Sequence, residues 1–214
     1  MKDSTKKKLD DLFCRFSQLT VIQDSIYNAT AIMIESYKNG GKLLVCGNGG
    51  SAADALHIVG ELMKGFVLNR DLPKELKQKI STCSEYGEYI TGNLQAALPA
   101  IALVGSVSLE TAYSNDKCPD LCFAQQVLGL GAEGDVFLGI STSGNSQNVI
   151  YAAEVAKALG LKVIVLSGRT GGKLKDICDC LVNVPEDETY KIQELHLPVY
   201  HAVCLALENE FFGE

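Results

Sequence analysis

The sequence predicts an α/β fold, in which a doubly wound parallel sheet lies between two layers of helices. Three observations predict it: a length of 214 residues that suits one domain, a series of short apolar runs, and helical stretches between these runs. The runs are β-branched and lack the polar alternation of half-exposed strands, so we interpret them as strands buried on both faces. They are Lys42 to Cys46, Ala100 to Val104, Val136 to Ile140, Lys162 to Leu166 and Cys180 to Val184.

Two helices precede the first run. Apolar side chains recur at spacings of three and four over residues 9–19, which predicts an amphipathic helix, and residues 22–37 form a second one. The sequence Asn39-Gly40-Gly41 ends this second helix. We therefore treat residues 1–39 as an N-terminal helical pair within a single domain that spans residues 1–214.

Further helices are expected between the runs, over residues 51–63 and 146–158, and after the last run, over residues 189–212. The stretch from Phe66 to Leu98 is more polar, with helical pieces expected over residues 73–80 and 86–97. We interpret residues 68–97 as an insertion within the domain. An insertion of this length more often has a function than none.

Composition limits the partners of the chain. It carries 19 Lys and Arg against 26 Asp and Glu, a formal net charge of −7, so we expect no nucleic acid partner. The longest nearly uncharged apolar stretch, Ala96 to Val107, is interrupted by Pro99 and Gly105 and is too short to cross a bilayer. The first residues lack the apolar core of a signal peptide. We expect a soluble, cytoplasmic protein with no membrane partner.

The eight cysteines are expected to be reduced thiols, most of them in apolar surroundings, because a chain of this length without a secretory signal has no need of a disulfide framework. Cys178 and Cys180 form one closely spaced pair, and Cys118 and Cys122 form another. Either pair could be half of a zinc site, but neither has a matching second pair. The metal knuckle is the less favoured interpretation.

Two turns rich in glycine and hydroxyl groups follow predicted strands and precede predicted helices. The first is Gly47-Asn48-Gly49-Gly50-Ser51, and the second is Ser141-Thr142-Ser143-Gly144-Asn145-Ser146. Glycines expose backbone N–H groups, the helix N-terminus carries partial positive charge, and hydroxyls add donors, so each turn is suited to an anion such as a phosphate monoester. The alternative is that these residues only cap helices. Two such turns at strand ends favour phosphate. The motifs of nucleotide-binding loops are absent.

A second group of candidate residues lies on the predicted helices. His57 and Glu61 are four residues apart and share one helix face. Taken alone, such a pair is more often an ordinary surface or core contact than a functional one. Gln193 and His201 are eight residues apart on the last helix, so two long side chains could reach one metal ion. His196, on the same helix, is interpreted as a partly buried residue without a chemical role.

These residues resemble the sugar isomerase (SIS) domain family, and within it the phosphoheptose isomerase branch. The resemblance covers nearly the whole chain. It rests on Cys46 to Ser51 followed by His57 and Glu61, on Asn115-Asp116, on Gly134-Asp135, on Gly139 to Ser146, and on Ile192 to His196 followed by His201.

The resemblance implies a three-layer α-β-α sandwich with a five-stranded parallel sheet of the flavodoxin-like type, assembled as a homotetramer with active sites at subunit contacts. The apolar faces of the N-terminal helices fit such an oligomer surface. It implies one zinc ion per subunit, held by His57, Glu61, Gln193 and His201. The implied substrate-binding residues are Asn48, Gly49, Gly50, Ser51, Glu61, Asn115, Asp116, Ser141, Thr142, Ser143, Ser146 and Gln193.

The implied activity is an aldose–ketose isomerisation between sedoheptulose 7-phosphate and D-glycero-D-manno-heptose 7-phosphate through an enediolate. Such chemistry needs a carboxylate base and an acid, and Glu61 and His201 are the candidates. Two alternatives remain open. One is a non-catalytic sensor of a sugar phosphate, or an adaptor of a replication initiator, and the other is an isomerase or lyase of a different sugar phosphate, the lyase without zinc.

Overall fold

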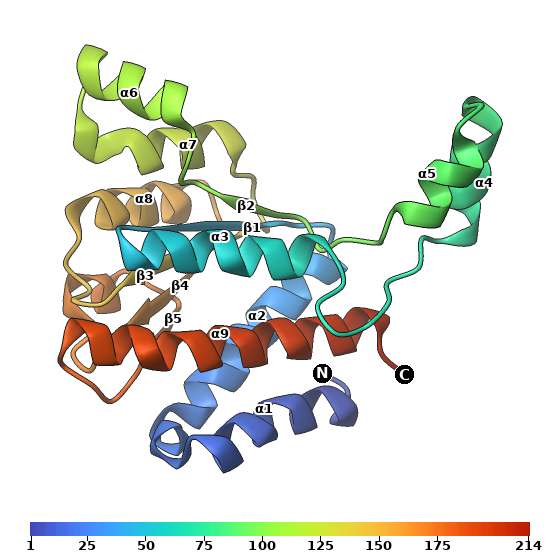
Figure 1. The fold of residues 1–214 in the computed structure, drawn as a ribbon. Helices are drawn as coiled ribbons and strands as arrows, with labels where there is room; N and C mark the ends of the chain where they lie inside the picture. Colours follow the sequence, from blue (N-terminus) through green and yellow to red (C-terminus); the bar gives the residue numbers. More distant parts are fainter.

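The computed structural model describes residues 1–214 and shows five parallel strands between two layers of helices (Figure 1). The strands are β1 Leu43–Gly47, β2 Ala100–Ala102, β3 Val136–Ser141, β4 Lys162–Ser167 and β5 Cys180–Asn183. Their order in the sheet is β2-β1-β3-β4-β5, and every neighbouring pair is parallel. This is the flavodoxin-like order, so the predicted fold is confirmed.

The helices agree with the sequence pattern where an apolar stripe exists. They are α1 Asp3–Arg15, α2 Gln23–Lys38, α3 Gly50–Met63, α4 Lys74–Cys83, α5 Gly87–Asn93, α6 Val107–Asp116, α7 Cys122–Leu130, α8 Gln147–Ala158 and α9 Thr189–Phe212. Helices α6 and α7 were not predicted. None of the residues of α6 is buried, and α7 is only nine residues long, so neither gives a readable hydrophobic period.

Side chains alternate between the two faces of the sheet and so form two cores. Leu43, Val45 and Leu138 face α2, α3 and α9, whereas Leu44 and Phe137 face α7 and α8. Burial on both faces explains why the strands read as unbroken apolar runs. The layer formed by α2, α3 and α9 is the one that carries the histidines at positions 57 and 201.

The N-terminal helices have a different role from the one expected. Leu9 and Leu12 of α1 and Ile26 and Met33 of α2 all belong to the core that contains α9. Their apolar faces are therefore covered by the chain itself, so the apolar stripes do not by themselves indicate an oligomer surface. The reason is that α9 is long enough to pack against both helices (Figure 1).

Helices α4 and α5 form a hairpin that projects from the body of the molecule (Figure 1). The two helices pack against each other, and α4 has no buried residue. Leu76, Tyr86, Tyr89 and Leu94 are exposed on or beside the hairpin. It occupies the middle of the segment 68–97, and its helices correspond to the two helical pieces that were expected there, although the second ends at Asn93, earlier than expected.

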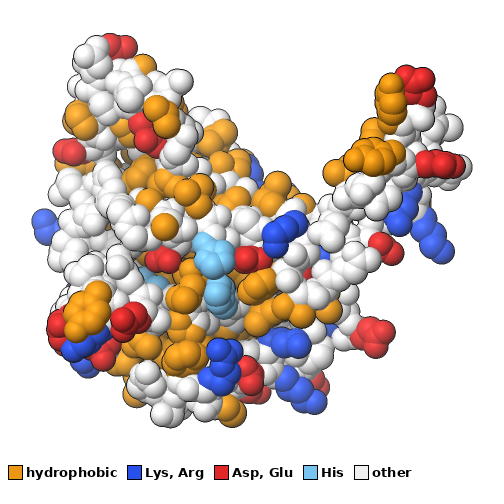
Figure 2. Space-filling model, in the orientation of Figure 1, with side chains coloured by type: hydrophobic (Ala, Val, Ile, Leu, Met, Phe, Trp, Pro, Cys, Tyr) orange, Lys and Arg blue, Asp and Glu red, His pale blue; other side chains and the backbone are white.

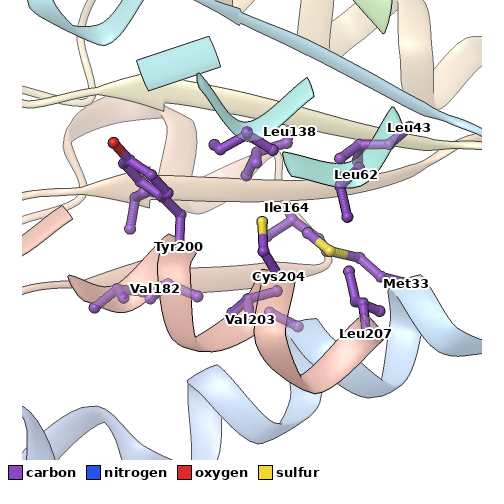
Figure 3. Close-up of a pocket in the computed structure, with 14 residues that line it drawn as sticks. Met33, Leu43, Leu62, Leu138, Ile164, Val182, Tyr200, Val203, Cys204 and Leu207 are labelled. Atoms are coloured by element: carbon purple, nitrogen blue, oxygen red, sulfur yellow. The ribbon is translucent and has the colours of Figure 1, made fainter. Parts of the chain in front are cut away.

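A small cavity of about 30 Å³ lies in the core between the sheet, α2 and α9 (Figure 3). All its lining residues are hydrophobic, among them Met33, Leu62, Val203, Cys204 and Leu207. This space is a packing defect. It is small, and its lining offers no polar group that could bind a water molecule or a polar ligand.

All eight cysteines are free, and Cys46, Cys122, Cys180 and Cys204 are buried. Burial raises the pKa of the Cys204 thiol to about 12, so this thiol stays protonated at neutral pH. None of the helices combines the length and the apolar character that crossing a bilayer requires.

Candidate functional site

The two glycine-rich turns lie side by side at the carboxyl edge of the sheet. The first leads from β1 into α3 and the second from β3 into α8, and β1 pairs directly with β3. Because β1 pairs with β2 on its other side, the chain changes direction across the sheet at this point. Open α/β sheets bind their ligands at such a switch point.

Glycine is required in both turns. Gly49 has φ +57° and Gly144 has φ +65°, values that side chains with a Cβ rarely adopt. A Cβ at Gly144 would also lie 2.0 Å from the carbonyl oxygen of Gly171. Neither α3 nor α8 is capped by a side chain at its N-terminus. The N–H groups of Ser51, Ala52 and Val149 already donate to backbone carbonyls of the turns, so the N–H groups suited to an external anion are those at the very start of each helix, such as that of Gly50.

Polar side chains connect the first turn to α8 and join residues within the second turn. The amides of Asn48 and Asn148 exchange two hydrogen bonds of 2.9 Å, and the hydroxyls of Ser141 and Ser146 lie 2.9 Å apart. Ser141 and Ser51 are buried, whereas Ser143 is exposed. A cavity of about 360 Å³ opens beside Asn48 and Asn148 and extends toward α6 and α7. The turns thus form one polar surface with room for a small molecule next to it.

Helices α3 and α9 lie next to each other and run in the same direction (Figure 1). The side chain of Gln193 lies against Gly50, where α3 begins, and Tyr200 and His201 meet His57 two turns later. Sequence spacing alone could place these residues on helices but could not pair the helices. The contact brings residues from distant parts of the chain to one surface, where histidine side chains are visible at the centre of the face in Figure 2.

Three of the four expected metal ligands lie together. The Nε2 atom of His57 is 3.2 Å from Oε1 of Glu61 and 3.5 Å from Nε2 of His201. The rings of the two histidines meet edge to face with centroids 4.9 Å apart. Burial, together with the neighbouring His57, lowers the pKa of His201, which favours its neutral form.

Hydrogen bonds orient the ring of His57. The hydroxyl of Tyr200 donates to Oδ1 of Asp54 over 3.2 Å, and its oxygen lies 3.0 Å from Nδ1 of His57. Tyr200 of α9 thus contacts Asp54 and His57 of α3 and holds the imidazole so that Nε2 faces Glu61 and His201.

This donor set fits a metal ion in its chemistry. Two imidazole nitrogens and one carboxylate oxygen are ligands that zinc prefers, and a second partner on the other ring nitrogen, as Tyr200 provides for His57, is usual for ligating histidines. Zinc bonds of about 2.0–2.1 Å correspond to a tetrahedral edge of about 3.3 Å, close to the two measured separations. The side chains do not converge on one point: no group of three or more His, Cys, Asp and Glu side chains is arranged to hold a metal ion.

The remaining expected site residues are dispersed around this centre. Gln193 of α9 is half-buried and lies against Gly50, which begins α3 and precedes His57 by seven residues. Gln193 is therefore nearer to the first glycine turn than to the histidines. Asn115 and Asp116 are exposed at the end of α6, where the Asn115 amide donates to Asp116 over 2.9 Å. Ser114, beside them, lines the cavity next to Asn48.

His196 lies outside the site. Its side chain is fully buried, with Nε2 3.3 Å from the carbonyl oxygen of Ser167, and burial lowers its pKa to about 4. His196 was interpreted as a partly buried residue, whereas the structure shows it fully buried and away from the site. Sequence reasoning missed Asp54, Tyr200 and Asn148. Asp54 precedes His57 by three residues on one helix, which is the only signal that could have found it.

Comparison with known proteins identifies the family. The family model of the SIS domain matches residues 14–82 and 81–168. A phosphoheptose isomerase of a Nitratiruptor species is 43% identical over 186 residues, which are 87% of this chain and 86% of that protein. A phosphoheptose isomerase of Akkermansia muciniphila is 33% identical over 213 residues, and the match covers 100% of both chains.

A solved structure agrees with this comparison. The phosphoheptose isomerase GmhA of Neisseria gonorrhoeae has a TM-score of 0.73 and 34% sequence identity, and the match covers 94% of each chain. The matches to the Akkermansia protein and to this structure extend over nearly the whole chain. The chain therefore belongs to the SIS domain family and, within it, to the phosphoheptose isomerases, a group of phosphosugar isomerase enzymes.

Proposed function

We propose that the protein is an aldose–ketose isomerase that interconverts sedoheptulose 7-phosphate and D-glycero-D-manno-heptose 7-phosphate through an enediolate. The observation that carries this proposal is the carboxylate of Glu61 beside His57, whose ring meets that of His201, on a helix that begins at a glycine turn suited to phosphate. The relatives named above bear the name of this activity.

The substrate phosphate is assigned to the two turns. Backbone groups of Gly49 and Gly50 and the hydroxyls of the second turn would surround it, and the N-termini of α3 and α8 would favour its negative charge. The full set assigned to the substrate is Asn48, Gly49, Gly50, Ser51, Glu61, Asn115, Asp116, Ser141, Thr142, Ser143, Ser146 and Gln193.

The distance along α3 favours a long sugar. Glu61 follows Gly50 by eleven residues, which is about 16 Å along the helix axis, although the side chain of Glu61 inclines back toward the N-terminus. A substrate that binds near both the turn and Glu61 must therefore be long. A seven-carbon chain comes closer to this distance than a triose does, although it does not span the full axial rise.

The proton transfers are assigned to Glu61 and His201. In the direction from ketose to aldose, Glu61 removes a proton from C1 and returns it to C2, and a hydroxyl proton moves from O1 to O2 with His201 as the acid–base group. The two oxygens of Glu61 have different partners, since Oε1 faces His57 at 3.2 Å and Oε2 faces Lys64 at 3.3 Å. One oxygen can therefore bind a cation while the other accepts the proton.

We also propose one zinc ion per subunit, held by His57, Glu61 and His201, with Gln193 as the fourth ligand after a change of its side chain. When bound, zinc would polarise the two substrate oxygens and stabilise the developing negative charge. The support is the donor set and the two separations near a tetrahedral edge.

A homotetramer is a further part of the proposal. The projecting α4–α5 hairpin supports it, because α4 buries no residue and α5 buries only Gly87, and such short helices are marginal in water unless another surface covers them. Exposed Tyr86 and Tyr89 on the hairpin, and Leu56 and Met63 on α3, are the apolar side chains that a second subunit would cover. Light scattering of the purified protein tests this assembly.

The test of the activity is turnover of sedoheptulose 7-phosphate by zinc-loaded protein, with Glu61→Gln as the variant. We expect Glu61→Gln to lower kcat by at least about 100-fold, because the base is lost, while phosphate-ester binding measured by calorimetry stays within a few-fold. The matched control is Glu154→Gln, an exposed carboxylate on α8, which should behave as the wild type.

Other outcomes separate the alternatives. Binding of the sugar phosphate without turnover would support a sensor or adaptor, whose binding of a replication initiator a pull-down would test. Turnover of other ketose phosphates, but not of the heptose, would keep the chemistry and reject the substrate. Lyase activity on an amino-sugar phosphate in metal-free protein would reject the zinc proposal as well.

A further inference from the structure

A fully buried ion pair lies where α3 ends. Arg70 is 0% exposed and Glu208 of α9 is 1% exposed, and Nε of Arg70 donates to Oε1 of Glu208 over 2.8 Å. The guanidinium also donates to the carbonyl oxygens of Leu62, over 2.6 Å, and of Glu61, over 2.9 Å. These carbonyls belong to the last turn of α3, where no N–H group of the helix is available to donate to them.

Glu208 fixes the chain that follows α3. Its Oε1 accepts from the N–H of Phe66 over 2.7 Å, and its Oε2 accepts from the N–H groups of Val67 and Leu68 over 2.9 and 3.1 Å. Although burial alone would raise the pKa of Glu208, these hydrogen bonds and Arg70 hold it below the ordinary value. The carboxylate therefore remains charged and keeps all of these contacts.

The pair joins the two helices that carry the site. Glu208 lies seven residues after His201 on α9, about two turns along the helix, and Arg70 holds the backbone of Glu61 itself. A buried ion pair is weak evidence for stability, because desolvation of the charges costs as much as their attraction returns. Its several directed hydrogen bonds instead fix the position of the end of α3 against α9.

We propose that Arg70 and Glu208 are positioning residues, which hold the end of α3 against α9 so that the Glu61 carboxylate faces His57 and His201. This inference rests on the proposed role of Glu61 as the base. Displacement of a reacting group by about 1 Å costs on the order of 100-fold in rate, and loss of a supporting residue typically costs about 10–100-fold.

The chain offers a matched control. Asp135 is also a buried carboxylate, 3% exposed, that accepts from the N–H of Lys42 and of Ala132 and pairs with the Lys42 ammonium at 2.6 Å. It precedes β3, and Lys42 precedes β1, so this pair supports the amino edge of the sheet and has no contact with α3 or α9. Asp135→Asn thus removes the same kind of interaction away from the site.

The experiment compares Glu208→Gln with Asp135→Asn in the full chain. We expect similar losses of thermal stability, but a kcat lower by about 10–100-fold only in Glu208→Gln, with KM within about threefold since the phosphate turns are untouched. Arg70→Lys keeps the charge but not the directed hydrogen bonds and should also lower kcat. It replaces Glu208→Gln if that variant does not fold.

A second measurement does not depend on the substrate. The chain has only three histidines, so the ring signals of His57 and His201 can be followed by NMR in metal-free protein. We expect them to shift in Glu208→Gln and Arg70→Lys but not in Asp135→Asn. If the wild type does not turn over the heptose phosphate, the proposed function fails and these signals alone decide the positioning role. Equal effects of Glu208→Gln and Asp135→Asn on kcat, or unchanged signals, would overturn it.

Discussion

The side chain of Gln193 depends on the absence of a side chain at Gly50. A Cβ built on Gly50 would lie 2.6 Å from Nε2 of Gln193, where ordinary contact begins at 3.4 Å. The substitution Gly50→Ala must therefore move the Gln193 amide by about 0.8 Å, the difference of these two distances. A shift of this size in a group that contacts substrate or metal costs up to about 100-fold in rate.

The stability of the protein should hardly change, because the obstacle is the flexible end of a side chain. Alanine also has a higher helix propensity than glycine, by up to about 1 kcal/mol in a helix interior. Gly60→Ala, on the same helix, is the matched control, because a Cβ there meets nothing within 4 Å. We expect both variants to unfold within about 1 kcal/mol of the wild type or to be slightly more stable.

The assays are urea unfolding, zinc content and turnover of sedoheptulose 7-phosphate. We expect Gly50→Ala to lose about 10–100-fold in kcat/KM and to bind zinc more weakly, and Gly60→Ala to retain both properties. If Gly50→Ala has the same kcat/KM as Gly60→Ala to within about threefold, then turnover does not depend on the position that the Gln193 side chain has in this structure.

Two further predictions concern stability. The pKa of His196 falls from 6.5 to about 4 on folding, so the native state is favoured by up to about 3 kcal/mol above pH 6.5 and loses this advantage as the pH falls toward 4. His196→Leu should flatten the pH dependence of unfolding over that range in urea titrations, and an unchanged slope would contradict the buried neutral imidazole. Val203→Ile adds one methylene group beside the cavity of about 30 Å³ and should raise the free energy of unfolding by up to about 1 kcal/mol, whereas a decrease would show that the cavity cannot accept it.

The local pattern of the chain predicted most of the sheet and the helices that carry apolar stripes. The run at Val136 to Ile140 was recognisable because a strand buried on both faces has no polar alternation. By contrast, α6 buries no residue, so its helical form left no pattern in the sequence. Likewise, the apolar stripe of α1 revealed a helix but not that α9 would cover it.

The candidate site shows the same division. Spacing placed His57 and Glu61 on one helix face, and the resemblance to the SIS domain family gave them a role. The glycine turns were recognisable because their residue types favour an anion. The meeting of His57 with His201, the support by Tyr200 and Asp54, and the ion pair of Arg70 with Glu208 depend on the parallel packing of α3 and α9. Residues 138 to 146 positions apart come into contact there. Local sequence determines which helices form, whereas the burial of apolar faces across the whole domain decides which helices become neighbours.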